Sequence, residues 1–402
     1  PLIQSIKVFL VSVATFNNII FILFYSVLFI FSLRLSILLY LAFKHKKRTR
    51  LSSAGDSFHP FVSVVIAAYN EEKVISRTIE SVLKSNYVNF EVIVVDDGSI
   101  DRTLMIIKEN FSNHKKVHLI HKKNGGKASA INTGIKKANG DIIISIDADT
   151  IISPDAISLL VRHFIDERVA AVSGNIKVGN MRNLLTIWQY VEYVTGFNLE
   201  KRAFAMLNCV TVVPGALGAW RKQVFEKIGY FTADTLAEDT DMTLRILREG
   251  YKFAIYEQAY AYTEAPEKSR DFLKQRYRWN FGTLQCFWKH KKAFGGIKHK
   301  SLGFIALPNM LLFQFLFPLF APFLDLLFVL GLFSGNIKES LLFYAIYLLT
   351  DFFICLFAFR LEKLSLKPLI PLFLQRIIYR YMLLWISWKS LLAALKGTRV
   401  SW

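Results

Sequence analysis

Asp141-Ile142-Ile143-Ile144-Ser145-Ile146-Asp147-Ala148-Asp149 is a run of apolar residues that ends in two carboxylates one residue apart. The apolar run predicts a strand buried on both faces. Residues two apart in a strand point to the same face, so Asp147 and Asp149 can converge on one ligand. A divalent cation with oxygen ligands, itself carrying a diphosphate, suits such a pair. The alternative is an Asx turn or a helix cap before Pro154.

Strand and helix patterns alternate around this stretch. Strands are predicted at residues 62–68, 90–95 and 117–121, and helices at residues 71–84, 101–110 and 127–138. This alternation predicts an α/β fold with a mainly parallel sheet and helices on both faces. Ligands of such sheets bind at the carboxyl ends of the strands. Three predicted strands end there in polar clusters, at residues 69–71, 96–97 and 147–149, which favours a ligand site over an isolated turn.

The segment Asn124-Gly125-Gly126-Lys127-Ala128-Ser129 is rich in glycine and precedes a predicted helix. The P-loop motif requires a glycine at the position of His121, so a P-loop (Walker A) NTPase is excluded. A glycine turn with a lysine at a helix N-terminus still suits a phosphate group.

The downstream half continues the pattern and then changes. A helix is predicted at 154–166, a strand at 169–174, a long aromatic helical stretch at 184–206, and a strand pair or hairpin at 252–263. Small residues at 214–220 would allow the backbone to approach a ligand closely. Glu238 and Asp239 begin a predicted helix, where acids also complement the helix dipole. Residues 268–290 mix aromatic and basic side chains, as in a helix lying at a membrane surface.

Apolar segments near both ends predict membrane spans. The chain is 53% hydrophobic, and its formal net charge is +19. Residues 8–43, 302–333, 339–359 and 368–395 are the candidate spans, and the basic run at 44–50 places the following domain in the cytoplasm by the positive-inside rule. Basic clusters beside apolar segments favour a membrane surface over nucleic acid. The three cysteines lack metal or redox spacing and are expected to be buried thiols.

Three arginines interrupt the apolar segments. Arg34 is expected to extend toward the cytoplasmic face. Arg376 and Arg380 lie one helical turn apart. They favour a hydrated route for a polar substrate, with snorkelling to the membrane surface as the alternative.

The motifs together resemble the family 2 inverting glycosyltransferases, specifically the processive membrane synthases of cellulose, chitin, hyaluronan and poly-N-acetylglucosamine. The resemblance covers roughly residues 61–292. It rests on the residues at 65–72, 95–101, 126–128, 147–149 and 238–239 and on Gln275-Arg276-Tyr277-Arg278-Trp279, a Gln-x-x-Arg-Trp element typical of the processive branch. It implies a GT-A (nucleotide-diphospho-sugar transferase) domain flanked by transmembrane and interfacial helices. The short chain favours the poly-N-acetylglucosamine, chitooligosaccharide or hyaluronan type over cellulose synthases.

The resemblance also implies roles for particular residues. Those that would bind the donor are Ala68, Tyr69, Glu71, Asp96, Asp97, Lys127 and Asp147. Asp149, helped by Asp147, would hold Mg²⁺ or Mn²⁺ on the diphosphate, where the metal neutralises the leaving group. Asp239, with Glu238 beside it, would take the proton of the acceptor hydroxyl.

The Gln-x-x-Arg-Trp element would complete the catalytic set at the cytoplasmic mouth of the membrane part. Gln275 and Arg278 would lie there, and Arg278 would stabilise the departing diphosphate. Trp279 would offer a flat apolar face to the acceptor sugar. The alternative for Trp279 is anchoring at the membrane interface.

These inferences predict four regions: an N-terminal membrane anchor (1–50), a cytoplasmic glycosyltransferase domain (51–267), amphipathic interfacial helices (268–300) and C-terminal transmembrane helices (301–402). The expected protein is a multi-pass plasma-membrane β-glycosyltransferase that elongates and exports a polysaccharide from a UDP-sugar, with UDP-N-acetylglucosamine favoured. Its partners would be the growing glycan, membrane lipids, and a polysaccharide deacetylase or accessory membrane subunit, with no nucleic acid.

Two other hypotheses remain open. A non-processive glycolipid-forming transferase would share the donor site. A transporter or scaffold with a degenerate nucleotide domain would be expected to lack at least one of the acids that this chain retains.

Overall fold

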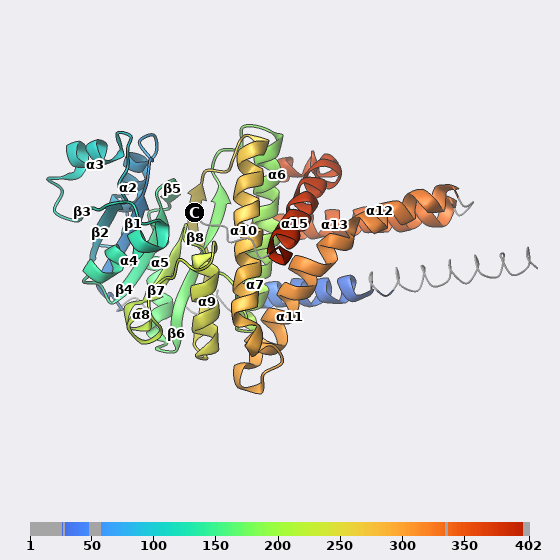
Figure 1. Ribbon diagram of the computed structural model, residues 1–402, viewed down its shortest axis with the longest axis horizontal. Coiled ribbons are helices and arrows are strands. Elements are labelled where there is room, and N and C mark those ends of the chain that lie inside the picture. The colour runs from blue at the N-terminus through green and yellow to red at the C-terminus, as the bar shows by residue number, and fades with distance from the viewer. Residues whose placement is uncertain (1–25, 27–28, 48–57, 334–336, 397–402) are drawn as a thin grey trace, which may run out of the picture.

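The computed structural model describes residues 26, 29–47, 58–333 and 337–396. A sheet flanked by helices forms one end of the molecule, and long helices extend from the other end (Figure 1). Helix α10 (Ser269–His290) runs between these two parts. Residues 1–25 and 27–28, which include about half of the first predicted span (8–43), lie outside the described residues.

The first half of the sheet is parallel. Its strands are β1 (Val62–Ala68), β2 (Phe90–Asp96), β3 (Val117–His121) and β4 (Ile142–Asp147), in the order β3-β2-β1-β4, joined through α2 (Ile75–Leu83), α3 (Thr103–Phe111) and α4 (Lys127–Lys137). The register pairs Ala68 with Asp96 and Ala67 with Asp147. The polar ends of these strands therefore lie side by side, and the predicted α/β fold is confirmed.

The second half of the sheet is mixed. It contains β5 (Thr150–Ile152), β6 (Val169–Val178), β7 (Gly218–Arg221) and β8 (Lys252–Thr263), with α5 (Ala156–Val161), α8 (Lys222–Ile228) and α9 (Glu238–Arg248) between them. Strand β7 lies antiparallel between β4 and β6, whereas β6 and β8 pair in parallel. The predicted hairpin at 252–263 is wrong, because these residues form one long strand whose register against β6 shifts at a bulge.

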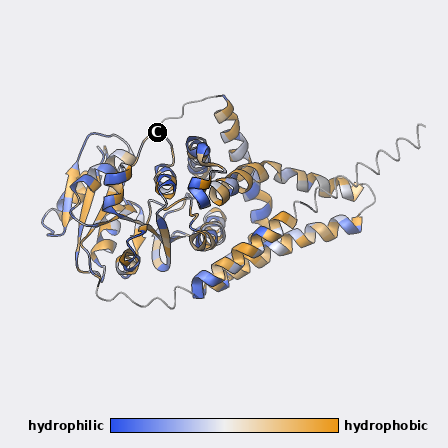
Figure 2. Cartoon of the chain, turned by 90° about the horizontal axis from the view of Figure 1, so that it is seen from below, coloured by the Kyte–Doolittle hydropathy of each residue, from blue (hydrophilic) through white to orange (hydrophobic). Residues whose placement is uncertain are grey.

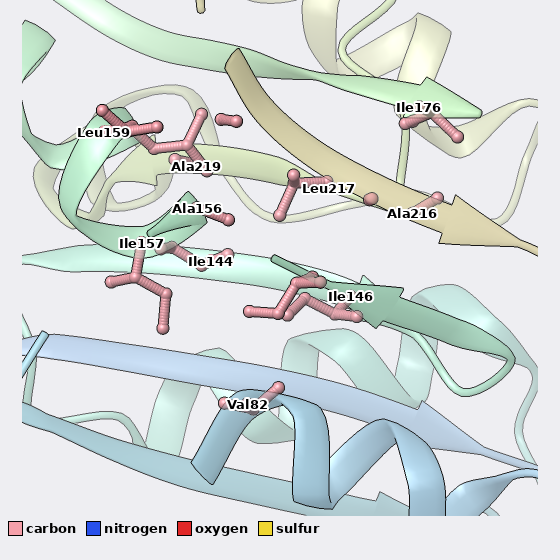
Figure 3. Close-up of a cluster of buried hydrophobic side chains, with 14 of the residues drawn as sticks. Val82, Ile144, Ile146, Ala156, Ile157, Leu159, Ile176, Ala216, Leu217 and Ala219 are labelled. Atoms are coloured by element: carbon pink, nitrogen blue, oxygen red, sulfur yellow. The ribbon is translucent and has the colours of Figure 1, made fainter. Parts of the chain in front are cut away.

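Strand β4 is covered on both faces, which explains its uninterrupted apolar sequence. Ile144 and Ile146 enter one hydrophobic cluster, whereas Ile143 enters the cluster on the opposite face. In Figure 3, Ile144 and Ile146 lie near Ile157 and Leu217. A strand packed on both faces has no solvent side for alternating polar residues.

The part of the chain after residue 301 is helical among the described residues, and many of its apolar side chains are exposed. Its longer helices are α12 (Phe317–Phe333), α13 (Ile337–Leu361) and α15 (Arg380–Leu395). By length and composition, the stretches Leu302–Phe320 and Ile337–Leu361 could each cross a membrane. Figure 2 shows these extended helices mostly in the hydrophobic colour. The prolines in 302–333 fall within a helical run that includes π-helical turns, so the segment bends without becoming a loop.

The arginines among the apolar helices have specific partners. Arg376 pairs with Asp351, and Arg380 pairs with Asp325. These pairs join α12, α13 and the segment leading into α15, so the two arginines connect these helices. The hydrated route for a polar substrate stays a prediction.

Arg34 likewise does not extend toward the surface. It bonds Glu200 at 2.6 Å and Asn309 at 3.1 Å, and thereby ties the helix formed by residues 29–47 to the body of the protein. The three cysteines are buried and free.

Candidate active site

A cavity of about 580 Å³ lies between the sheet and helix α10, within the size range of small-molecule sites. Eight of the predicted site residues line it: Lys127, Asp147, Asp149, Glu238, Asp239, Gln275, Arg278 and Trp279. Residues of the apolar helices, including Pro318 and Ile386, also line it. The cavity therefore connects the strand ends with the helical part.

Asp147 ends strand β4 and forms an ion pair with Lys127 at 2.5 Å. Lys127 begins α4 and also lies 3.7 Å from Glu238. A Cβ atom on Gly215 would lie 3.0 Å from Nζ of Lys127 and 3.2 Å from Oδ1 of Asp147. The absence of a side chain at Gly215 therefore leaves room for Lys127 and Asp147, and the predicted close approach of this backbone to a ligand stays a prediction.

Asp149 lies in the turn between β4 and β5. Its carboxylate accepts hydrogen bonds from Thr150 at 3.3 Å and from Thr263 of β8 at 3.2 Å. Burial, and then the charge of Asp147, raise the pKa of Asp149 to about 6. Two carboxylates that repel each other across a cavity form a suitable binding site for a divalent cation.

Whether this site suits a metal ion depends on how many ligand side chains the protein provides. Among the described residues, no group of three or more His, Cys, Asp or Glu side chains is arranged to hold a metal ion. Asp147 and Asp149 would therefore share the ion with oxygens from a ligand or water, as is usual for Mg²⁺ bound with phosphate groups.

Glu71 lies close to the same acids, although it is not among the cavity-lining residues. Burial, followed by the charges of Asp149 and Asp147, raises the pKa of Glu71 to about 7. Tyr69 beside it is 46% exposed. A cation or a ligand N–H group near Glu71 would favour its ionised form.

The predicted donor residues on β2 are engaged within the chain. Asp97 accepts hydrogen bonds from the backbone of Gly126 at 2.8 Å and Gly125 at 3.1 Å, and it pairs with Lys122. Asp96 contacts His121 at 2.6 Å, while its other oxygen is buried and has no hydrogen-bond partner in the part of the chain that the structure describes. These acids, with Ala68, do not line the 580 Å³ cavity.

Glu238 and Asp239 form the first turn of α9. Oδ1 of Asp239 accepts a hydrogen bond from the backbone N–H of Thr240 at 2.7 Å. Burial raises the pKa of Asp239, and the nearby Lys127 opposes this shift. A carboxylate with a raised pKa at the edge of a cavity is suited to accept a proton.

Helix α9 is fixed to α10 by a residue outside the predicted site. Asp241 is fully buried and accepts from His290 at 2.9 Å and from Lys289 at 2.9 Å, both near the end of α10. The helix carrying Asp239 and the helix carrying Gln275 are therefore joined by charged hydrogen bonds.

The guanidinium of Arg276 packs against the ring of Trp279. The guanidinium of Arg276 lies 4.4 Å from the centroid of the Trp279 ring and pairs with Glu192 at 2.5 Å. Glu192 also accepts from the hydroxyl of Tyr379 at 2.5 Å. The oxygen of Gln275 is buried beside the cavity and has no hydrogen-bond partner among the described residues. Arg276 belonged to the quoted motif, but sequence reasoning gave it no role.

Lys201 and Glu192 also line the cavity and were not predicted. Both lie in the helical stretch 184–206, which the structure forms as α6 (Leu184–Glu192), a π-helical segment and α7 (Leu199–Met206). The only signal available for these two residues was their charge within an aromatic helical stretch. The direction in which each side chain points depends on the π-helical segment between the two helices.

The fold and the sequence define the class of the protein. Residues 63–229 match the model of glycosyl transferase family 2. This part of the chain is therefore similar to family 2 glycosyltransferases, and its fold is GT-A. A solved structure, the mannosyltransferase PcManGT from Pyrobaculum calidifontis in complex with GDP-Man and Mn²⁺, superposes with a TM-score of 0.58 over 86% of this chain and 99% of that one, at 20% identity.

Similar proteins narrow the comparison. The poly-beta-1,6-N-acetyl-D-glucosamine synthase of Staphylococcus epidermidis is 30% identical over 237 residues, which are 58% of each chain. The synthase of the same name from Staphylococcus aureus strain COL is 31% identical over 222 residues, covering 55% of this chain and 54% of the relative. This chain therefore spans little more than half the length of the curated relatives it matches.

Proposed function

We propose that the protein is a processive, inverting β-glycosyltransferase that elongates a membrane-associated polysaccharide from UDP-N-acetylglucosamine. The observation that carries the proposal is the shared cavity, which brings the Asp147–Asp149 pair, Asp239 and Trp279 together and reaches the apolar helices. The similarity to poly-beta-1,6-N-acetyl-D-glucosamine synthases supports N-acetylglucosamine as the sugar.

The donor would lie across the carboxyl ends of the strands. Tyr69, Glu71 and Asp97 would bind the uridine end, with Ala68 and Asp96 beside them. Lys127 would move from its pair with Asp147 to the diphosphate, because a phosphate at the N-terminus of α4 also meets free backbone N–H groups.

A divalent cation, Mg²⁺ or Mn²⁺, would be held by Asp149 with the help of Asp147. Bound there, it would neutralise charge on the leaving diphosphate. Arg278 lines the same cavity and would stabilise that group by charge-assisted hydrogen bonds.

Asp239 would accept the proton of the acceptor hydroxyl. Its raised pKa gives it proton affinity above that of an ordinary aspartate. Attack from the Asp239 side, with the diphosphate leaving toward Lys127, would invert the anomeric carbon in one displacement. Glu238 would keep Lys127 and Asp239 in place from the adjacent position of α9.

The acceptor would stack on Trp279 and extend toward the apolar helices. Gln275 would offer its unpartnered oxygen to a sugar hydroxyl. Leu383 and Ile386 of α15 line the far part of the cavity, which supports passage of the glycan toward the membrane part after each transfer. In this arrangement the catalytic domain is cytoplasmic and the chain spans the plasma membrane.

A non-processive transferase that adds one sugar to a lipid is the second candidate. The apolar lining near Phe313 and Pro318 favours it, because a lipid tail would fit there. The two candidates differ in product: one yields a long glycan and the other a single sugar on lipid.

The test incubates the full chain in lipid with Mg²⁺ and UDP-N-acetylglucosamine, UDP-glucose or UDP-glucuronate. We expect UDP-N-acetylglucosamine to yield free UDP and a polymer. Digestion of this polymer by linkage-specific glycosidases identifies its linkage. Asp239→Asn should abolish both signals. If no donor yields product, or if the variant matches the wild type, the proposal is wrong. A product of one sugar on lipid would establish the second candidate.

A further inference from the structure

Lys201 occupies an unusual position on α7. Its residue is 8% exposed and lines both the 580 Å³ cavity and a small neighbouring cavity of about 10 Å³. Within the described part of the chain, its ammonium group makes no hydrogen bond or ion pair, and its charged neighbour is Asp239. The adjacent Arg202 is equally buried but pairs with Glu362 at 3.0 Å.

The side chain of Lys201 is largely buried, but its Nζ atom retains access to the cavity and has no protein partner among the described residues. A charge held in such a partly closed site lowers the stability of the folded protein unless a ligand or water completes its hydrogen bonds. Burial accordingly lowers the pKa of Lys201 to about 8. A methionine would fill similar space at no such cost. The lysine is therefore explained most directly by a ligand whose oxygen atoms complete its hydrogen bonds.

We propose that Lys201 is an acceptor-binding residue, whose ammonium group donates hydrogen bonds to oxygen atoms of the acceptor sugar beside Asp239. The inference rests on the proposed function and deepens it. The ligand class is a glycan with hydroxyl or N-acetyl oxygens next to the attacking hydroxyl.

The acceptor fits this position better than the donor diphosphate. Lys127 already faces Asp147 and Glu238 at the strand ends, where the diphosphate would lie. Lys201 comes from α7, and its charged neighbour is Asp239, the proposed base. In a single displacement the base and the acceptor occupy the side opposite the leaving group.

Lys201 shares its two cavities with charged and titratable groups from several elements. The acids are Asp147 at the end of β4, Asp149 after it, Glu238 and Asp239 on α9, Glu257 and Glu264 at β8, and Glu192 and Glu200 on α6 and α7. The remaining groups are Lys127 on α4, Tyr193, Arg202 on α7, and Arg276 and Arg278 on α10. Burial raises the pKa of Tyr193, so this tyrosine stays neutral near pH 8. Lys201 is therefore the group whose loss of charge near pH 8 would weaken acceptor binding.

The experiment measures transfer from UDP-N-acetylglucosamine to N-acetylglucosamine oligosaccharides with the wild type, Lys201→Met and Lys201→Arg. Lys222→Met serves as the matched control, since Lys222 bonds the carbonyl of Ala138 away from the cavity. For Lys201→Met we expect the acceptor KM to rise about 10- to 100-fold, the range for a hydrogen bond to a charged group. The donor KM should stay within about twofold. Thermal stability should equal or exceed that of the wild type, because an unpaired buried charge is gone.

The pH profile separates binding from structure. In the wild type, kcat/KM for the acceptor should fall above about pH 8 as Lys201 loses its proton. Lys201→Arg should remove this fall, because arginine stays charged. An unchanged acceptor KM, a raised donor KM or a loss of thermal stability in Lys201→Met would overturn the acceptor role alone. A wild type that transfers no N-acetylglucosamine would overturn the proposed function as well.

Discussion

Asp239 is the residue on which the proposed chemistry depends most. Asp239→Asn keeps the shape of the side chain but removes its ability to accept a proton, so kcat should fall about 100- to 10,000-fold. Donor KM should change little, because Lys127, Asp147 and Asp149 remain. Steady-state kinetics with UDP-N-acetylglucosamine measures both values. Asp234→Asn is the control, because Asp234 is exposed and pairs with Lys289.

The pH dependence of Asp239 has a definite sign. Its pKa is raised above the ordinary 3.8, so it binds a proton more tightly in the folded protein. The rate should therefore fall as the pH drops through a midpoint above 3.8, and Asp239→Glu should shift that midpoint. An acid limb that is identical in Asp239→Glu would assign the base role to another group.

Asp149 should control metal binding. Its pKa of about 6 means that a proton competes with the cation, so apparent metal affinity should decline below about pH 6. Asp149→Asn should weaken Mn²⁺ binding by at least about tenfold and lessen this pH dependence. Asp147→Asn should have the smaller effect. Titration calorimetry with Mn²⁺ and UDP measures these affinities, and a larger loss in Asp147→Asn would reverse the assignment.

Sequence reasoning found the acids but missed several of their neighbours, for a physical reason. Asp147, Asp149 and Asp239 occupy local patterns, a strand end and a helix start, that fix their position. Lys201 and Glu192 lie on helices whose inward face depends on the π-helical segment between them. Their role is set by tertiary packing, which a local pattern does not encode.

At the scale of elements, predictability followed length and burial. Strand β1 at residues 62–68 was predicted to the residue, because its apolar run is long and ends in polar residues. Strands β5 and β7 have three and four residues and were missed. Such short strands are specified by pairing with β8 and β4, not by their own sequence.

In the proposed function, helix α10 depends on the contact between Arg276 and Trp279 as well as on its Gln-x-x-Arg-Trp element. Arg276→Lys keeps a positive charge but loses the planar group over Trp279, and a cation–π contact contributes about 0.5–2 kcal/mol. We expect acceptor KM to rise about 2- to 30-fold. Donor KM should be unchanged, as measured by initial rates with oligosaccharide acceptors.

Two further variants test whether Arg276, Glu192 and Tyr379 act together to position Trp279. Glu192→Gln removes the charge that pairs with Arg276, and Tyr379→Phe removes the hydroxyl that contacts both Glu192 and Arg276. Their effects should therefore be less than additive with Arg276→Lys. Arg270→Lys, near the exposed start of α10, is the control. Fully additive effects, or an effect confined to donor KM, would show that Arg276 does not position Trp279.

At the scale of the whole molecule, one partly exposed and one buried ion pair join the sheet domain and the helical part. Glu200 of α7 holds Arg34 of the N-terminal helix, and Glu362 beyond α13 holds Lys177 of β6 at 2.9 Å. Removing one partner of such a buried pair leaves an unpaired charge. The two parts are therefore fixed relative to each other, so the cavity keeps its course from the strand ends to α15.

In the proposed function, we expect the part of the cavity lined by α15 to influence product length. Ile386 of α15 is 2% exposed and lines the cavity far from the acids in sequence. Ile386→Trp should narrow the passage, so the glycans should become shorter while donor KM and the first transfers persist. Leu392→Trp is the control, because Leu392 lies on the same helix but is 50% exposed. Mass spectrometry of the products measures the length distribution, and thermal unfolding checks the cost of overpacking, about 1–3 kcal/mol. If Ile386→Trp makes glycans of normal length while remaining folded, the glycan does not leave through this cavity.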